Sequence, residues 1–269
     1  MKERRSKINT LQMFECQLFK YTRNKWIWLL LLLPAVCVLP AFIYLAVKFP
    51  EFSSGGVAAF YVNPYEEGIV TIYKIFRILF PIVMAIYAAQ IFIIDRDGND
   101  GRNFSCVPFS KNGIFIIKYS LLLLGCFISI LAAYFVFLSG VKICNIVSPQ
   151  MNFMQYDMRL NILLFFLRIF FVGCCILLIQ YGLHLLTNNI YIPLVFAFAA
   201  LMIGFTPQNL QYLDYYYPMG YLGNICEKFS NFPVAIMWKD MLFMLIPPLI
   251  ITVLTRIMRG VSLLASMKN

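Results

Sequence analysis

Long apolar stretches separated by short polar segments make up most of the sequence. About 20 consecutive apolar residues are enough for a helix to cross the hydrocarbon core of a bilayer. Because backbone groups in hydrocarbon must pair within the chain, each such stretch is expected to be helical. The pattern predicts six membrane spans, at about 26–47, 71–94, 114–140, 158–186, 190–206 and 239–258.

The residues before the first span follow a different pattern. Leu11, Phe14, Leu18 and Tyr21 recur every three or four positions, so a helix would place them on one side and polar residues on the other. This predicts an amphipathic helix at 7–25 that lies in the membrane interface. A cytoplasmic extension of the first span is the alternative.

The composition supports a membrane protein. The mean hydropathy is +0.78, 61% of residues are hydrophobic and 13% are charged, whereas about a quarter of the residues of a soluble protein are charged. We therefore predict an all-α polytopic membrane protein, with residues 1–269 forming a single transmembrane domain. The basic N-terminus is expected to be retained, because the first apolar run is too long for a signal peptide and no small-residue cleavage site follows it.

The net charge of +10 fits a membrane topology better than nucleic-acid binding. With six spans and both termini cytoplasmic, 14 of the 22 basic residues but only 5 of the 12 acidic residues fall on the inner side. Cytoplasmic loops carry such an excess of Lys and Arg. The distribution predicts this orientation and no nucleic-acid partner.

Two polar segments are candidates for function. Residues 95–113 are predicted to be cytoplasmic and contain acids, glycines and a short piece around Phe104 that can form a helix with an apolar side chain exposed. We interpret this segment as a docking surface for a soluble partner; a solvated connection is the alternative. Residues 207–238 are predicted to form an extracellular segment between spans five and six, rich in tyrosine.

The sequence contains no pattern typical of an enzyme. No Gly-rich phosphate-binding loop, no Cys/His spacing for a metal and no nucleophile with a nearby base occurs. The single histidine, His184, is expected to be a hydrogen-bonded structural residue. Cys144 and Cys226 are both predicted to lie outside, where free thiols and a disulfide between them are the alternatives.

Charged residues inside spans indicate structural pairing or function. Arg168 lies in the middle of span four, where a charge costs at least about 2.5 kcal/mol. Pairing with a neighbouring span or reaching outward is one interpretation, and a functional site is the other. Lys74 and Arg77 lie on one side of span two, near its outer end, where reaching to lipid headgroups is the alternative to function.

Several local sequences resemble permeases of the ABC-2 type. The stretch from Phe14 to Lys25, before a Leu-rich span, is similar to the lead-in segment of lantibiotic-immunity and bacitracin-resistance permeases. Residues 95–118 resemble their first cytoplasmic loop, in which an acid and an aromatic residue precede a proline and two basic residues. Tyr215-Tyr216-Tyr217-Pro218 resembles the aromatic-proline element before their last span. The topology match covers nearly the whole chain.

The resemblance implies the permease subunit of an ABC exporter in the bacterial plasma membrane, with no enzymatic activity or cofactor of its own. It implies two copies of an ABC ATPase that binds ATP and magnesium, a second permease subunit, identical or paralogous, and contact with membrane lipid. The cargo implied is a cationic antimicrobial peptide. An exporter of lipid, glycan or a small drug, and a membrane scaffold or sensor, are the alternatives.

The resemblance also gives candidate residues. The ATPase-coupling residues are Asp95, Arg102, Asn103, Phe104, Val107, Pro108 and Lys111. The candidates for a transport path or subunit interface are Lys74, Arg77, Arg168, Tyr215, Tyr216, Tyr217 and Pro218. For the tyrosine cluster, an aromatic belt at the membrane interface is the alternative.

Overall fold

The computed structural model describes residues 10–54, 64–97, 111–147 and 159–203, together with Leu249 and Val253. In these ranges all regular secondary structure is helical. The helices are α1 (Thr10–Thr22), α2 (Lys25–Val36), α3 (Leu39–Ser54), α4 (Pro64–Asp97), α6 (Lys111–Val147), α7 (Arg159–Thr187) and α8 (Tyr191–Ile203).

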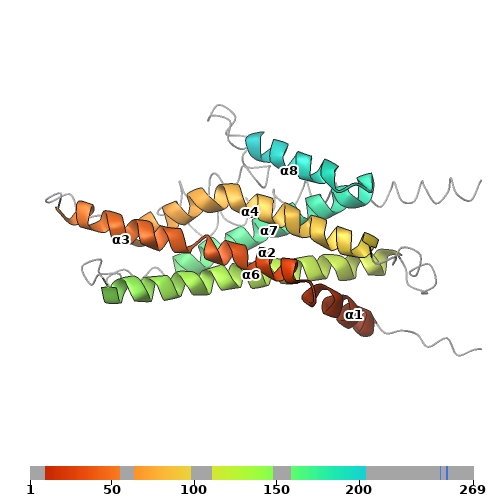
Figure 1. Ribbon diagram of the computed structural model, residues 1–269, viewed down its shortest axis with the longest axis horizontal. Helices are drawn as coiled ribbons and strands as arrows, with labels where there is room; N and C mark the ends of the chain where they lie inside the picture. The colour runs from red at the N-terminus through yellow and green to blue at the C-terminus, as the bar shows by residue number, and fades with distance from the viewer. Residues whose placement is uncertain are drawn as a thin grey trace, which may run out of the picture.

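The long helices form an elongated bundle (Figure 1). α6 packs against α2 and α7, and α4 packs against α2, α7 and α8. α4 and α7 run in the same direction along the bundle, and α6 runs in the opposite direction (Figure 1). The short helix α1 contacts α2 and α6 at one end of the bundle.

Four helical stretches in the described ranges are long and apolar enough to cross a membrane: Lys25–Val47, Pro64–Ile94, Ile116–Val147 and Leu160–Thr187. They correspond to the first four predicted spans, so the prediction of an all-α membrane protein is confirmed. The fifth predicted span is represented by α8, whose 13 residues cover only about 20 Å. The sixth lies outside the described ranges except for two single residues.

The first predicted span is made of two helices rather than one. α2 ends at Val36, and the chain continues through Cys37 and Val38 before α3 begins at Leu39. Pro40 has no N–H for a helical hydrogen bond, and its ring clashes with the carbonyl group four residues earlier. The break therefore follows from the proline.

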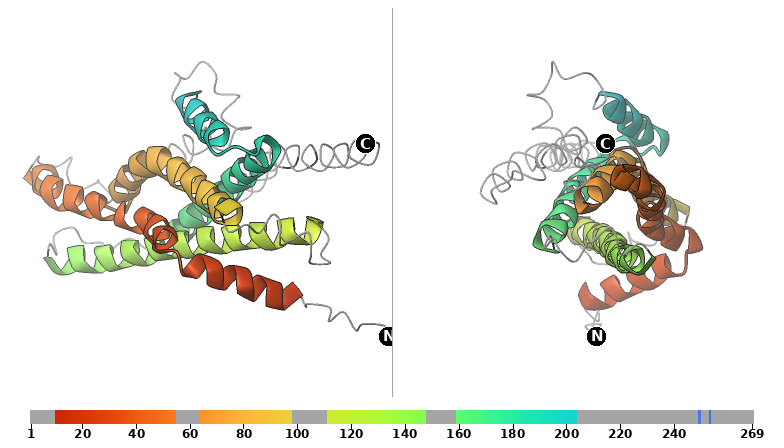
Figure 2. Two further views of the ribbon diagram at one scale, coloured as in Figure 1. Left: turned by 45° about the vertical axis from the view of Figure 1, so that its right-hand side comes forward. Right: turned by 90° about the vertical axis from the view of Figure 1, so that its left-hand side faces the viewer.

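The connection between the first two predicted spans is shorter than predicted. We expected a loop at 48–70, but α3 continues to Ser54 and α4 begins at Pro64. Proline is favoured at the first position of a helix, and Glu66 and Glu67 in the first turn interact favourably with the helix dipole. α4 is curved (Figure 2), and it contains Pro81; a proline inside a helix is a common cause of bending.

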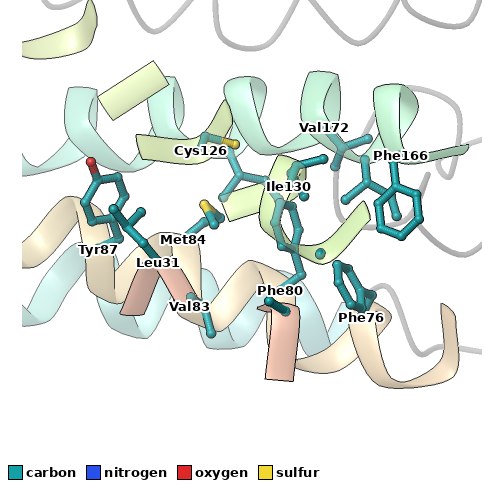
Figure 3. Close-up of a cluster of buried hydrophobic side chains, with 14 of the residues drawn as sticks. Leu31, Phe76, Phe80, Val83, Met84, Tyr87, Cys126, Ile130, Phe166 and Val172 are labelled. Atoms are coloured by element: carbon teal, nitrogen blue, oxygen red, sulfur yellow. The ribbon is translucent and has the colours of Figure 1, made fainter. Parts of the chain in front are cut away.

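Apolar side chains of α2, α4, α6 and α7 fill the centre of the bundle (Figure 3). Phe76 and Phe80 of α4 stack with ring centroids 5.7 Å apart. Further along the bundle, Phe137 of α6 lies between Phe42 of α3 and Phe166 of α7, with centroid separations of 5.4 and 6.0 Å. Offset and edge-to-face aromatic pairs of this kind add to the stability that burial gives.

Candidate functional site

The helix ends that flank residues 98–110 lie together at one end of the bundle. α4 ends there at Asp97, α6 begins there at Lys111, and the turn between α7 and α8 lies at the same end (Figure 1). The helices therefore extend into the segment 95–113 that the sequence predicted to be a loop. Asp95 lies in the last turn of α4 and Lys111 is the first residue of α6. The other coupling candidates lie outside the described ranges: Arg102, Asn103, Phe104, Val107 and Pro108.

The turn between α7 and α8 is closed by local hydrogen bonds. His184 Nδ1 lies 3.1 Å from the carbonyl oxygen of Asn189, to which it donates. The Asn189 side chain accepts a hydrogen bond of 2.8 Å from the backbone N–H of Tyr191 and thereby caps α8. Thr187 Oγ1 donates to the carbonyl oxygen of Leu183 at 2.8 Å. The prediction that His184 is hydrogen-bonded is confirmed.

Asn188 makes the reversal of direction possible. Its φ angle is 48°, in the left-handed region, where asparagine is accepted more readily than most residues. Its N–H donates to the carbonyl oxygen of His184 at 3.0 Å. The sequence Thr187-Asn188-Asn189 thus ends α7 and starts α8 within three residues.

A ring contact joins this turn to the end of α4. The His184 ring stacks on Phe92, with centroids 5.2 Å apart and the planes 18° from parallel. His184 is fully buried and Phe92 is nearly so. The contact lies five residues before Asp97, at which α4 ends.

α4 and α7 pack against each other along a line of contact, here called the seam. The seam continues from the His184–Phe92 contact into the centre of the bundle. A Cβ atom at Gly173 would lie 2.9 Å from Cζ of Phe80 and 2.7 Å from Sγ of Cys126 on α6. Gly173 is 11 residues before His184, and Phe80 is 12 residues before Phe92. At 1.5 Å per residue, the two helices stay in contact over roughly 17 Å.

The N-terminal helix is fixed to the same end of the bundle. Asn24 caps α2 by accepting the N–H of Trp26 at 3.0 Å, and Trp28 Nε1 donates to the carbonyl oxygen of Thr22 at 2.8 Å. Tyr21 is buried and Leu18 is half-buried, on the side that the sequence pattern predicted.

The transport-path candidates lie on different helices. Lys74 is exposed and Arg77 is half-buried on α4. Arg168, on α7, is buried with 6% of its surface exposed, and both arginines have interactions with other residues. The remaining candidates lie outside the described ranges: Tyr215, Tyr216, Tyr217 and Pro218.

Cysteine and metal chemistry do not contribute a site within the residues that the structure describes. No group of three or more His, Cys, Asp or Glu side chains in these ranges could hold a metal ion. The thiol of Cys144 is free and buried. Its proposed partner, Cys226, lies outside the described ranges.

A bundle of long apolar helices whose connections are short is shared by many membrane proteins, and the comparison with known families decides between them. The family model described as ABC-2 family transporter protein matches residues 13–204, which is more than half of the chain. The chain belongs to the ABC-2 transporter family. No curated protein and no solved structure matches it.

Membership of the ABC-2 family places the chain in the plasma membrane as a multi-pass protein. It also implies partnership with ABC ATPase subunits. The resemblance stated from the sequence is therefore confirmed at the level of the ABC-2 permeases.

Two residues near this end of the helical bundle were not singled out from the sequence. Phe92, which stacks on His184, is one of many aromatic residues in apolar stretches, and no pattern distinguished it. Gln180 is fully buried on α7. Its amide, four residues before the only histidine in an otherwise apolar run, is a signal that the sequence did contain.

Proposed function

We propose that this chain is the transmembrane permease subunit of an ATP-driven exporter, which removes a lantibiotic-like antimicrobial peptide from the membrane and so provides immunity or resistance. The match of residues 13–204 to the ABC-2 family carries the proposal. ATP and magnesium would bind to the partner ATPase, and the chain itself would have no enzymatic activity.

The proposed assembly contains two ATPase subunits and two permease subunits, identical or paralogous, surrounded by lipid. The permease would have six spans with both termini in the cytoplasm. The excess of basic residues on the side containing 98–110 supports this orientation.

The proposed coupling route begins at residues 98–110. Both helices that leave this segment are long and continuous: α4 and α6 extend over 34 and 37 residues. An ATPase that binds the segment around Phe104 would therefore move two helices at once. Because His184 stacks on Phe92, movement of α4 would also reach the turn between α7 and α8. ATP would favour one of two arrangements of this body.

The proposed cargo is cationic and amphipathic. Glu66 and Glu67 lie in the first turn of α4, at the bundle end opposite to residues 98–110 (Figure 1). Both side chains are half-buried, and negative charge at the outer face attracts a cationic peptide. We include Lys74, Arg77, Arg168 and the tyrosine cluster Tyr215–Pro218 as candidates for the path or for the permease–permease interface.

Coupling is tested with the chain purified together with its ATPase and reconstituted in vesicles. Phe104→Ala and the charge reversal Arg102→Glu are expected to leave ATP hydrolysis in place and to abolish ATP-dependent transport. Phe19→Ala is the matched control, because Phe19 is exposed on α1 and is not proposed to dock. Full transport in both coupling variants would contradict the docking role.

The cargo is tested in the same vesicles with a fluorescent lantibiotic and with a fluorescent uncharged lipid analogue. ATP is expected to accelerate release of the peptide from the membrane and to leave the lipid analogue in place. Release of the lipid analogue alone would replace the peptide proposal with lipid export.

A further inference from the structure

Two polar side chains lie fully buried on the inner face of α7. Gln180 and His184 each have 0% of their surface exposed, and they are one helical turn apart. Gln180 is seven residues after Gly173, so it lies on the side of α7 that faces α4 and α6. The amide and the imidazole therefore lie together in the seam between helices.

Three polar atoms of this pair have no hydrogen-bond partner in the part of the chain that the structure describes. They are Nε2 and Oε1 of Gln180 and Nε2 of His184. A buried polar group that lacks a partner costs about 1–3 kcal/mol. Unpaired groups are rarer still inside a membrane protein, where no bulk solvent reaches them.

The hydrogen bond to Asn189 determines which ring nitrogen of His184 carries the proton. Its Nδ1 faces the carbonyl oxygen of Asn189 at 3.1 Å, and a carbonyl oxygen can only accept. Nδ1 therefore carries a proton, and in the neutral ring the lone pair is on Nε2. Gln180 offers an NH2 group with two N–H donors and a carbonyl acceptor one turn away. The pair thus presents two acceptor atoms and one NH2 group on the same face of α7, one helical turn apart.

We propose that Gln180 and His184 form an internal water-binding site in the seam between α4 and α7. Water is the ligand that supplies donors and an acceptor together, and buried waters make about three hydrogen bonds to groups of this kind. A bound water accepts from Nε2–H of Gln180 and donates to Nε2 of His184. Oε1 of Gln180 accepts from this water or from a second one.

The chain offers a direct test because it contains a single histidine. The full chain, carrying a histidine-free tag and ¹⁵N-labelled histidine, is placed in lipid bilayers for solid-state NMR. Magnetisation transferred from water is expected to reach the His184 ring, and the ¹⁵N shift of Nε2 is expected to report an accepted hydrogen bond.

Gln180→Leu is the informative variant, because it removes two of the three protein groups that hold the water. Transfer from water to the ring is expected to fall by about half or more, and the Nε2 shift to move toward that of an unbonded nitrogen. Gln90→Leu on α4 is the matched control, since Gln90 is half-buried near the same depth of the bundle; it is expected to leave both signals unchanged.

Two outcomes overturn the proposal. One is a wild-type spectrum without transfer from water to the ring, which decides the question even if Gln180→Leu does not fold. The other is transfer that persists unchanged in a folded Gln180→Leu protein. The test needs no ATPase and no cargo, so its result is independent of the proposed transport function.

Discussion

Replacing Gly173 by alanine is expected to weaken the contact among α4, α6 and α7. The added Cβ would lie 2.7 Å from Cys126 Sγ and 2.9 Å from Phe80 Cζ, whereas non-bonded carbon atoms pack at about 3.5–4.0 Å. Cys126 and Phe80 are both buried, so neither can move aside freely. Overpacking of this kind costs about 1–3 kcal/mol.

Gly68 provides the matched control for this substitution. Its Cβ would meet Leu45 Cδ1 at 3.1 Å and Phe137 at 4.0 Å, and the nearer atom is the end of a side chain that can rotate. Alanine is favoured over glycine in a helix by about 1 kcal/mol at both positions. Gly173→Ala is therefore expected to be less stable than Gly68→Ala by about 1–3 kcal/mol.

The comparison is made by unfolding the purified variants in mixed detergent micelles with increasing SDS, followed by tryptophan fluorescence. The free energy of unfolding is expected to be higher for Gly68→Ala than for Gly173→Ala. If the Gly173 variant is as stable as the Gly68 variant, α7 does not approach α4 and α6 as closely as described, and the seam that places Gln180 and His184 is wrong.

Three further predictions concern single positions. Asn188→Gly is expected to keep or raise the stability, because glycine adopts positive φ freely, whereas Asn188→Val is expected to lose at least about 1 kcal/mol; equal stability of the two variants in the SDS titration would contradict the turn. Pro40→Ala is expected to join α2 and α3 through Cys37 and to increase helical circular dichroism; an unchanged spectrum would show that the proline does not cause the break. Tyr87→Phe removes a hydrogen bond of 3.3 Å to the carbonyl oxygen of Leu121 and is expected to cost about 0.6 kcal/mol in the same titration; a stabilised variant would contradict that bond.

The membrane-spanning stretches could be predicted from the sequence because hydropathy reports directly which residues suit lipid. The four stretches found in the described ranges correspond to the first four predicted spans. The ends of the helices could not be predicted in the same way. Polar residues at Glu51 to Ser54 and at Asp95 to Asp97 continue a helix beyond the apolar run, since a helix outside lipid is free to carry charge.

Which side of each helix faces the protein interior was harder to predict than the existence of the helix. In α1, apolar and polar residues alternate with the helical period, and the buried side around Tyr21 follows from that pattern. α7 is apolar on nearly all sides, so its hydropathy does not indicate which side faces the protein. Leu177 is fully buried while Leu167 is exposed, and no property of leucine distinguishes them.

The residues that do indicate the inner side of α7 are the exceptions to its apolar composition. Lipid tails are as apolar as leucine, so helices in a bilayer associate through close packing of small residues and through polar contacts. Gly173, Gln180 and His184 are separated by seven and four residues, spacings that keep them on one side of a helix. A glycine that admits Phe80 and Cys126, and two polar groups that are unfavourable in lipid, therefore select the same face. In a helix of this composition, the positions of small and polar residues carry the information on packing that hydropathy does not.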